Sequence, residues 1–349
     1  MGPPVFSFDT TADEVVRGVD LAGVTAVVTG ASGGLGLETA RVLGSAGATL
    51  VLPVRDPAAF SASDGYARLA VPTERVDLVA LDLASLRSVH RAAAQIGARH
   101  PVIDILINNA GVMFTPHRTT DDGFEFQFGI NHLGHFLLTT QLLPQLRAAA
   151  ARGGARVVNV TSDAHKYFGP IDLTDVNFER RGYDPFSAYG QSKSANVLLT
   201  VELQRRFGPD GVSALVVHPG NIVTTGLARY MDRATIKKLV DMGGDAFAPH
   251  NIKSEAQGAA TAVWAATASS LREHGGAYLA DCQLAESTPE ATDPDTARRL
   301  WELSERWVST ALDATGPGGP PSPATPTRST AAPAAPGRPP LPHGRRPYP

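Results

Sequence analysis

A short apolar run, Val24 to Val28, leads into the glycine-rich segment 29–36 (TGASGGLG), and a helical pattern follows from about Leu35 to Ala46. A continuous apolar run of this length is typical of a strand buried on both faces of a parallel sheet. Glycines permit a tight turn and a close approach of phosphate to the backbone, and the helix N-terminus faces that phosphate with unpaired N–H groups. The segment therefore favours a strand–turn–helix unit for a dinucleotide pyrophosphate over an ordinary glycine-rich turn.

Further apolar, β-branched runs follow along the chain, and helical patterns separate most of them. Strands that alternate with helices are typical of a parallel sheet with helices on both faces. The further strands are expected at about residues 49–54, 76–81, 102–107, 157–161, 213–217 and 277–279. The sequence predicts an α/β fold, a single domain built on a Rossmann-type doubly wound parallel sheet of about seven strands.

The two ends of the chain differ from this pattern. Residues 1–19 are expected to form a loose N-terminal arm and a short helix, because Thr11 and Glu14 have capping-box spacing. Residues 20–312 make up the Rossmann domain. Residues 313–349 are expected to be a disordered tail, since 12 of the 27 prolines lie from Gly316 onward among few apolar residues. A groove that binds proline-rich segments could be its partner, but we prefer a passive extension.

Composition excludes several classes of protein. A formal net charge of -3 provides no basic surface for nucleic acid. The one cysteine, Cys282, excludes an internal disulfide and fits a reducing compartment. We find neither an apolar run of about 18 residues that could span a membrane nor a secretion signal. We therefore expect a soluble cytoplasmic protein without a membrane span or a metal site.

Polar and small residues follow the expected strands, where a doubly wound sheet binds its ligands. Arg55 follows the second strand, where NAD sites usually place an acid, and its charge suits the 2′-phosphate of NADP(H). Asp56 could instead bind a ribose hydroxyl, so NAD(H) stays an alternative. Asp82 could accept a hydrogen bond from an adenine amino group. The small residues of segment 108–111 (NNAG) would let the backbone lie against a flat ring.

Tyr189 and Lys193 begin a helical pattern and are four residues apart, so they lie on one helix face, one turn from each other. A nearby ammonium favours the phenolate and lowers the pKa of tyrosine from its usual value near 10. The pair is therefore a candidate for acid–base chemistry, although Tyr-x-x-x-Lys alone is also common on surfaces.

Taken together, these motifs resemble the short-chain dehydrogenase/reductase family. The matching elements, in family order over about residues 20 to 310, are Thr29-Gly30-x-x-x-Gly34-x-Gly36, Asn108-Asn109-Ala110-Gly111, Asn131, Ser162, Tyr189-x-x-x-Lys193 and Pro219-Gly220-x-Ile222-x-Thr224. Segments 126–136 (FQFGINHLGHF) and 192–197 (SKSANV), the pair Asp281-Cys282 and segment 298–301 (RRLW) resemble the branch of retinol dehydrogenases, WW-domain oxidoreductases and protochlorophyllide reductase.

The resemblance implies a role for each catalytic residue. Tyr189 would be the general acid/base, and Lys193 would lower its pKa and hold the nicotinamide ribose. Ser162 would hydrogen-bond the substrate oxygen. Asn131, within a long helical pattern over residues 124–146, would hold a water that links Lys193 to solvent. Ile222 and Thr224 would orient the nicotinamide carboxamide and bind phosphate.

The implied cofactor site comprises Gly30, Ser32, Gly33, Gly34, Leu35, Gly36, Arg55, Asp82, Leu83, Asn109, Ala110, Gly111, Tyr189, Lys193, Pro219, Gly220, Ile222 and Thr224. The expected activity is NADP(H)-dependent interconversion of an alcohol and a carbonyl on an apolar small molecule. Residues 166–186 would form a substrate lip and residues 226–254 a lid. A homodimer through the helices that carry Asn131 and Tyr189 is the family expectation. The alternatives are an NADP(H) sensor without catalysis and a sugar-nucleotide epimerase.

Overall fold

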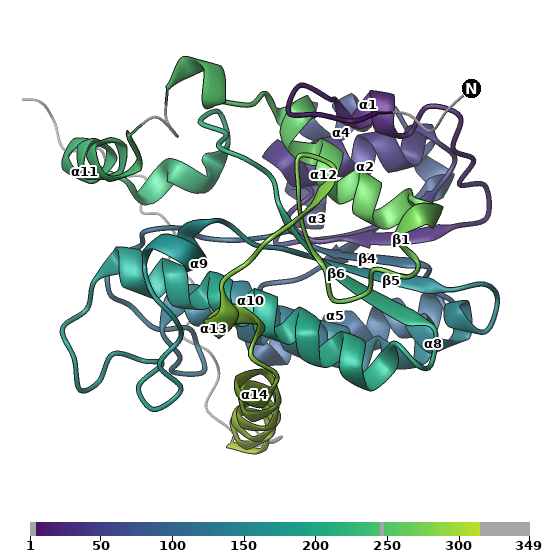
Figure 1. The fold of residues 1–349 in the computed structure, drawn as a ribbon. Coiled ribbons are helices and arrows are strands. Elements are labelled where there is room, and N and C mark those ends of the chain that lie inside the picture. Colours follow the sequence, from purple (N-terminus) through teal and green to yellow (C-terminus); the bar gives the residue numbers. More distant parts are fainter. Residues whose placement is uncertain (1–4, 245–247, 315–349) are drawn as a thin grey trace, which may run out of the picture.

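The computed structural model describes residues 5–244 and 248–314, and within them eight strands form one sheet in the order β3-β2-β1-β4-β5-β6-β7-β8 (Figure 1). The strands are β1 (Thr25–Val28), β2 (Thr49–Val54), β3 (Val76–Ala80), β4 (Ile105–Asn108), β5 (Ala155–Val160), β6 (Val212–His218), β7 (Tyr278–Ala280) and β8 (Gln283–Ala285). Neighbouring strands are parallel except β7 and β8. The predicted doubly wound sheet is confirmed, with one added antiparallel edge strand.

The α-helices are α1 (Ala12–Val15), α2 (Gly34–Ser45), α3 (Pro57–Ser61), α4 (Asp64–Leu69), α5 (Leu86–Arg99), α6 (Phe126–Phe128), α7 (Gly134–Gln141), α8 (Leu143–Ala150), α9 (Ala164–Tyr167), α10 (Pro185–Phe207), α11 (Arg233–Gly243), α12 (Glu255–Thr267), α13 (Pro289–Thr292) and α14 (Pro294–Ala314). Short 3₁₀ turns are η1 (Thr73–Arg75), η3 (Gly226–Tyr230), η5 (Pro249–Asn251) and η6 (Ser269–Leu271), and a π-helical turn, η2, spans Gly129–Leu133.

Strand β1 lies at the centre of the sheet, where the strand order reverses. Its residue Val27 is in register with Val51 of β2 on one side and with Leu106 of β4 on the other. All three side chains are fully buried, as expected for strands covered by helices on both faces. The reversal opens a crevice at the carboxyl ends of β1 and β4, which is where doubly wound sheets bind ligands.

Helices cover both faces of the sheet (Figure 1). Helices α1, α2 and α12 pack together on one face, and α5, α7, α8 and α10 cover the other. Each face has its own apolar core, with Leu43 and Val263 in one and Phe136 and Leu198 in the other. This layered packing fixes the strand ends from which the functional side chains project.

The long helix expected over residues 124–146 is interrupted. The π-helical turn η2 separates α6 from α7, and a further break separates α7 from α8. A π turn adds one residue to a helical turn and is frequent at functional sites. Asn131 lies in this turn and is fully buried.

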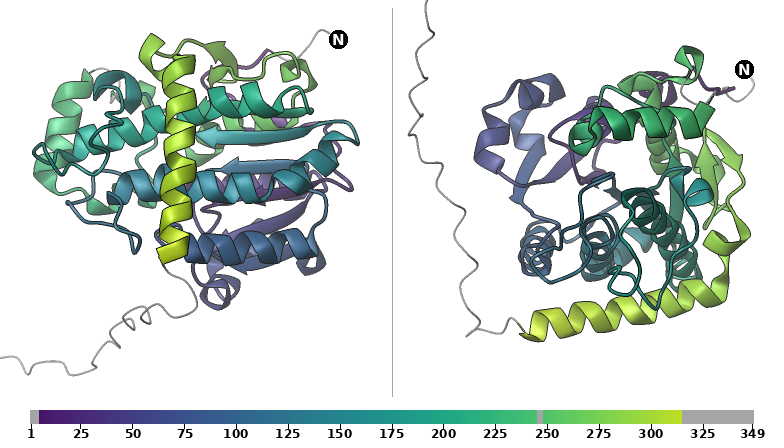
Figure 2. Two further views of the ribbon diagram at one scale, coloured as in Figure 1. Left: turned by 90° about the horizontal axis from the view of Figure 1, so that it is seen from below. Right: turned by 90° about the vertical axis from the view of Figure 1, so that its left-hand side faces the viewer.

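Helix α14 lies across the α10 face of the molecule, as Figure 2 shows. His132 Nε2 and Ser304 Oγ are 3.0 Å apart, and the Trp301 ring packs edge-on against Phe136. The helices expected to pair in a dimer are therefore partly covered by this segment. Helix α14 also continues to Ala314, two residues beyond the expected domain boundary, and the rest of the predicted tail lies outside the described residues.

No helix in the described part of the chain is long and apolar enough to cross a membrane. The short N-terminal helix has the expected capping box between Thr11 and Glu14. The arm before it was expected to be loose. The structure instead holds residues 6–9 against the domain, where Gln283 Nε2 donates to the Phe6 carbonyl and Gln257 Nε2 donates to the Asp9 carbonyl.

Candidate active site

The glycine turn between β1 and α2 packs tightly against the end of β4. A Cβ atom built on Gly36 would lie 2.4 Å from Asn109 Nδ2 and 2.4 Å from the Gly30 carbonyl oxygen. Gly30 itself has a φ of +71°, a conformation that side chains disfavour. Asn109 Nδ2 donates to the Thr29 carbonyl at 2.9 Å. The glycines are therefore required for the close approach of two strand ends that border the crevice.

Thr29 and His135 link this crevice to the π-helical turn. Thr29 Oγ1 accepts from the backbone N–H groups of Asn109 at 2.9 Å and Ala110 at 3.0 Å. His135 Nδ1 is 3.0 Å from the Asn131 carbonyl, and its Nε2 is 2.9 Å from Thr29 Oγ1. Burial lowers the pKa of His135 to about 4, so the ring is neutral at pH 7. Because a carbonyl only accepts, Nδ1 carries the proton and Nε2 accepts from Thr29.

A cavity of about 390 Å³ occupies the crevice. Its lining includes these residues of the expected cofactor site: Gly30, Ser32, Gly33, Gly34, Leu35, Gly36, Arg55, Asp82, Leu83, Asn109, Ala110 and Gly111. The described lining also contains Arg118 and Arg229, so with Arg55 it holds three guanidinium groups against one carboxylate, that of Asp82. This cationic lining, beside the N-terminus of α2, suits an anionic dinucleotide.

Segment 219–224 contributes none of the described lining residues, although Pro219, Gly220, Ile222 and Thr224 were expected at the cofactor. The neighbouring Thr225 lines the cavity instead, and its Cγ2 would lie 3.2 Å from a Cβ atom built on Gly34. Ile222 packs against α12, where its Cδ1 would lie 2.9 Å from a Cβ atom on Gly258. Sequence reasoning missed Thr225, Arg118 and Arg229 because their place in the cavity lining depends on contacts between segments distant in sequence.

Lys193, Asn131 and Gly111 meet at the carboxyl end of β4. A Cβ atom built on Gly111 would lie 3.3 Å from Asn131 Oδ1 and 3.8 Å from Lys193 Nζ. The Asn131 side chain donates to the Val112 carbonyl and to Ser192 Oγ and accepts from the Val112 N–H. Asn131 thus fixes the loop after β4 to helix α10. The water expected beside Lys193 stays a prediction.

Tyr189 and Lys193 lie one turn apart on α10, as their spacing predicts. Lys193 Nζ donates to the Val160 carbonyl at 3.1 Å and lies 5.6 Å from the centre of the Tyr189 ring. Burial lowers the pKa of Lys193 to about 8. Burial also raises the pKa of Tyr189, and the Ser162 side chain acts in the opposite direction. The expected lowered pKa of Tyr189 was wrong for this structure, because desolvation of the phenol is the largest effect on it.

The surroundings of Tyr189 are aromatic and apolar. Its ring is 5.1 Å from that of Phe114, which in turn lies 4.4 Å from Phe186. Phe168 of segment 166–186 joins this cluster, and Met231 of segment 226–254 packs against it. The two segments expected to border the substrate therefore meet beside the phenol.

Comparisons with known proteins agree with this architecture. Residues 24–235 match the family model for short chain dehydrogenases. Human retinol dehydrogenase 13 is 40% identical over 296 residues, which cover 82% of this chain and 85% of that protein. The chloroplastic short-chain dehydrogenase TIC 32 A of Brassica napus is 37% identical over 308 residues, covering 86% of this chain and 93% of that protein.

Two solved structures are also similar. A Mycobacterium paratuberculosis protein of uncharacterized function is 37% identical with a TM-score of 0.65, covering 83% of this chain and 95% of that chain. The RhlG/NADP complex of Pseudomonas aeruginosa is 27% identical with a TM-score of 0.57, and the match covers 75% of this chain and 95% of that chain. The chain therefore belongs to the short-chain dehydrogenase family, in its retinol-dehydrogenase-like branch, and is an NAD(P)-dependent oxidoreductase of alcohols and carbonyls.

Proposed function

We propose that this enzyme uses NADP(H) to interconvert an alcohol and a carbonyl on an apolar small molecule, with Tyr189 as general acid/base. The observation that carries the proposal is the placement of buried Tyr189 and Lys193 on one face of α10. The Ser162 side chain hydrogen-bonds the Tyr189 phenol and lowers its pKa. This group borders the strand ends that also form the cationic cavity. An NADP(H) sensor would not need such an acid–base pair.

Each residue has a distinct task in this proposal. The nicotinamide supplies or accepts the hydride when bound. In the reductive direction Tyr189 donates the phenolic proton to the substrate oxygen, and Ser162 donates a hydrogen bond to that oxygen. The Lys193 ammonium stabilises the resulting phenolate, which offsets the cost of burying it. Lys193 also holds the nicotinamide ribose, and Asn131 fixes the loop beside it.

The cofactor is held along the crevice. Gly30, Ser32, Gly33, Gly34, Leu35 and Gly36 would hold the pyrophosphate, and Asp82 and Leu83 would border the adenine. Arg55 follows β2 and lines the cavity, so its guanidinium is the proposed partner of the 2′-phosphate. Asn109, Ala110 and Gly111 lie along the nicotinamide side. Ile222 and Thr224 of segment 219–224 would orient the nicotinamide carboxamide and bind phosphate.

The apolar substrate class follows from the cluster of Phe114, Phe168, Phe186 and Met231 around Tyr189. In this proposal residues 166–186 are a substrate lip and residues 226–254 a lid. Purified protein incubated with NADPH and a panel of apolar aldehydes and ketones, followed by NADPH absorbance, tests the reaction. Consumption that is lost in Tyr189→Phe is expected. No consumption with any carbonyl, and no NADPH formation from the matching alcohols with NADP⁺, would contradict it.

Two further proposals concern the cell and the assembly. We place the enzyme in the cytoplasm, since the chain has one cysteine and it is buried and free; fractionation of cells that express it tests this. Pairing of two chains through the helices that carry Asn131 and Tyr189 stays a prediction. Light scattering of the purified parent chain tests it, since a dimer has twice the mass of the monomer.

A further inference from the structure

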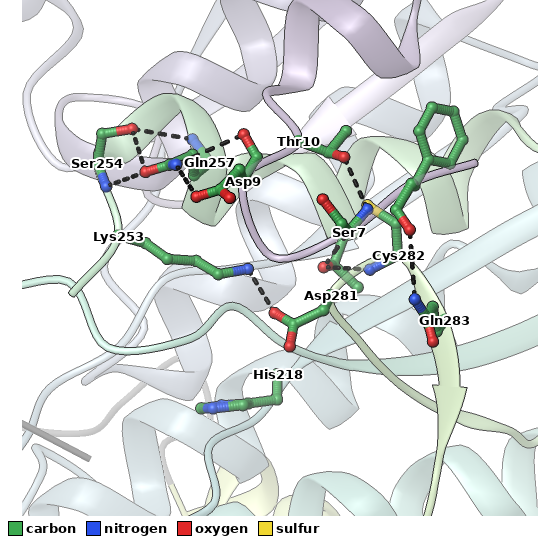
Figure 3. Close-up of polar contacts among 12 residues, drawn as sticks. Ser7, Asp9, Thr10, His218, Lys253, Ser254, Gln257, Asp281, Cys282 and Gln283 are labelled. Carbon is green, nitrogen blue, oxygen red and sulfur yellow. Dashed lines mark hydrogen bonds and ion pairs between the residues drawn. The ribbon is translucent and has the colours of Figure 1, made fainter. Parts of the chain in front are cut away.

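Lys253 is a buried cation beneath the segment that follows β6. Its Nζ lies 2.5 Å from Asp281 Oδ1. The Lys253 side chain is 1% exposed, whereas that of Asp281 is 44% exposed. The ammonium also lies 4.7 Å from the centre of the Phe8 ring, so the N-terminal arm helps to cover it. Figure 3 shows Lys253 reaching toward Asp281, with His218 beside the carboxylate.

The Lys253 stem and backbone hold the Pro219–Gly220 turn. Gly220 has a φ of +85°, and a Cβ atom built on it would lie 2.7 Å from Lys253 Cδ. The Lys253 N–H donates to the Asn221 carbonyl at 2.8 Å, and Asn221 pairs with Ile252 in an isolated parallel bridge. The course of segment 219–224 is therefore set by a residue some thirty positions further along the chain.

Asp281 lies in a tight hairpin turn. It forms, with Cys282, the two-residue connection between β7 and β8, and both have positive φ, 51° and 54°. Such a turn favours Asn, Asp and Gly, so Asp281 suits its position, whereas Cys282 is strained in the left-handed region. Cys282 is buried, and its N–H donates to Thr261 Oγ1 at 3.2 Å. The packing of Cys282 thus holds a strained turn that directs Asp281 toward Lys253.

His218, the last residue of β6, lies near Asp281 in Figure 3 and pairs with Asp163 on its other side. His218 Nε2 is 3.7 Å from Asp163 Oδ2, and Asp163 directly follows Ser162. Asp163 Oδ1 accepts from the Tyr278 hydroxyl at 2.5 Å. Asp163, Tyr278 and His218 therefore form a polar group next to the strand end that leads into Asp281.

We infer that the Lys253–Asp281 ion pair is a positioning device for the nicotinamide half of the cofactor. The pair holds segment 219–224 in the conformation that receives the carboxamide, and it does not touch the adenine half, which binds at the glycine turn and Arg55. The inference rests on the proposed function for the location of the nicotinamide. It assigns a purpose to the Asp281-Cys282 pair of the sequence motif.

Two ligands distinguish binding at the nicotinamide half of the site from binding at the adenine half. NADP⁺ carries the nicotinamide, whereas 2′,5′-ADP carries only the adenosine with its phosphates. In Lys253→Met, which keeps the stem and removes the charge, NADP⁺ affinity measured by calorimetry should fall about tenfold or more, as lost positioning predicts. The affinity for 2′,5′-ADP should change less than about twofold. The KM for NADP⁺ should rise more than kcat falls.

Asp281→Asn tests the pair from its exposed side. It leaves the buried ammonium without its carboxylate, so its loss of NADP⁺ affinity should equal or exceed that of Lys253→Met. The double variant, Lys253→Met with Asp281→Asn, should bind NADP⁺ with the affinity of Lys253→Met alone, because the buried ammonium is gone. Arg298→Met is the control, since Arg298 and Asp295 form an equally short pair at 2.5 Å with side chains 53% and 81% exposed.

Three results would overturn the inference. One is unchanged NADP⁺ affinity in both single variants. Another is an equal loss for NADP⁺ and 2′,5′-ADP, which would mean general destabilisation. In both cases a parent chain that binds both ligands leaves the proposed function intact. A parent chain that binds neither ligand would instead contradict the proposed function, and the inference with it.

Discussion

Lys193 Nζ lies 5.6 Å from the centre of the Tyr189 ring and donates to the Val160 carbonyl, so helix α10 ties its cation to the end of β5. Both side chains are buried. The low polarity around them raises the pKa of Tyr189 and lowers that of Lys193 to about 8. Burial therefore disfavours the phenolate and the ammonium alike, yet a pKa of about 8 leaves Lys193 mostly protonated at pH 7.

Removal of the Lys193 charge should therefore abolish most of the turnover. In Lys193→Met we expect kcat to fall by about 100-fold or more, the range of general acid–base catalysis. The protein should remain folded, because methionine fills the same buried space without a charge to desolvate. Steady-state kinetics with thermal melting measures both quantities. A kcat within a factor of about three of the parent value would contradict the role of Lys193.

The glycine turn offers a matched pair of substitutions. Gly36→Ala should prevent stable folding or lower the melting temperature strongly, because its Cβ atom would lie 2.4 Å from the Gly30 carbonyl. Gly33 has extended backbone with a φ of 179°, and nothing lies within 4 Å of a Cβ atom there. Gly33→Ala should keep the parent melting temperature yet weaken NADPH binding, since the pyrophosphate needs that space. Unchanged NADPH affinity in Gly33→Ala would place the phosphates elsewhere.

Arg55 should decide between the two nicotinamide cofactors. In Arg55→Ala the ratio of NADPH to NADH affinity should fall about tenfold or more, because a charge-assisted hydrogen bond to the 2′-phosphate is lost. NADH affinity should change little. Arg68→Ala is the control, since Arg68 is exposed and its nearest acid, Glu255, is 3.9 Å away. An affinity ratio that does not change would remove Arg55 as the phosphate partner.

Two buried histidines make the fold sensitive to mild acid. Burial lowers the pKa of His132 to about 3 and that of His135 to about 4. The unfolded chain binds more protons than the folded chain between these values and about 6.5, so stability is lost as pH falls through that window. At pH 5 each histidine should cost about 2 kcal/mol of unfolding free energy.

Urea unfolding at pH 7.5, 6 and 5 measures this dependence. In His132→Phe the new ring can pack between Phe128 and Phe136. The unfolding free energy of this variant should depend less on pH than that of the parent chain. His274→Gln, at an exposed position, should leave the slope unchanged. Equal unfolding free energies at pH 7.5 and pH 5 in the parent chain would show that these rings are not held neutral.

Local patterns predicted most of the sheet and half of the site. The run before Thr29 and the glycines after it form a strand and a turn through short-range chemistry, so their positions were correct. Arg55 and Asp82 line the cavity because parallel strands end at one edge. The face shared by Tyr189 and Lys193 followed from helical spacing alone.

What depends on contacts between distant segments could not be predicted. Strand β8 has three residues and no periodic signal, and its turn at Asp281 is recognisable only from backbone angles. The π turn at Asn131 looks helical in sequence. Thr225 reaches Gly34 through tertiary packing. The direction in which the Tyr189 pKa shifts depends on how deeply the phenol is buried, and a sequence motif does not show this.

The most direct test of the account is the kinetics and NADPH binding of Tyr189→Phe. The variant lacks only the phenolic oxygen, so it should bind NADPH with an affinity within about twofold of the parent chain and show at least a 100-fold loss of kcat. Turnover near the parent rate in Tyr189→Phe would contradict the assignment of this phenol as the group that exchanges the proton with the substrate.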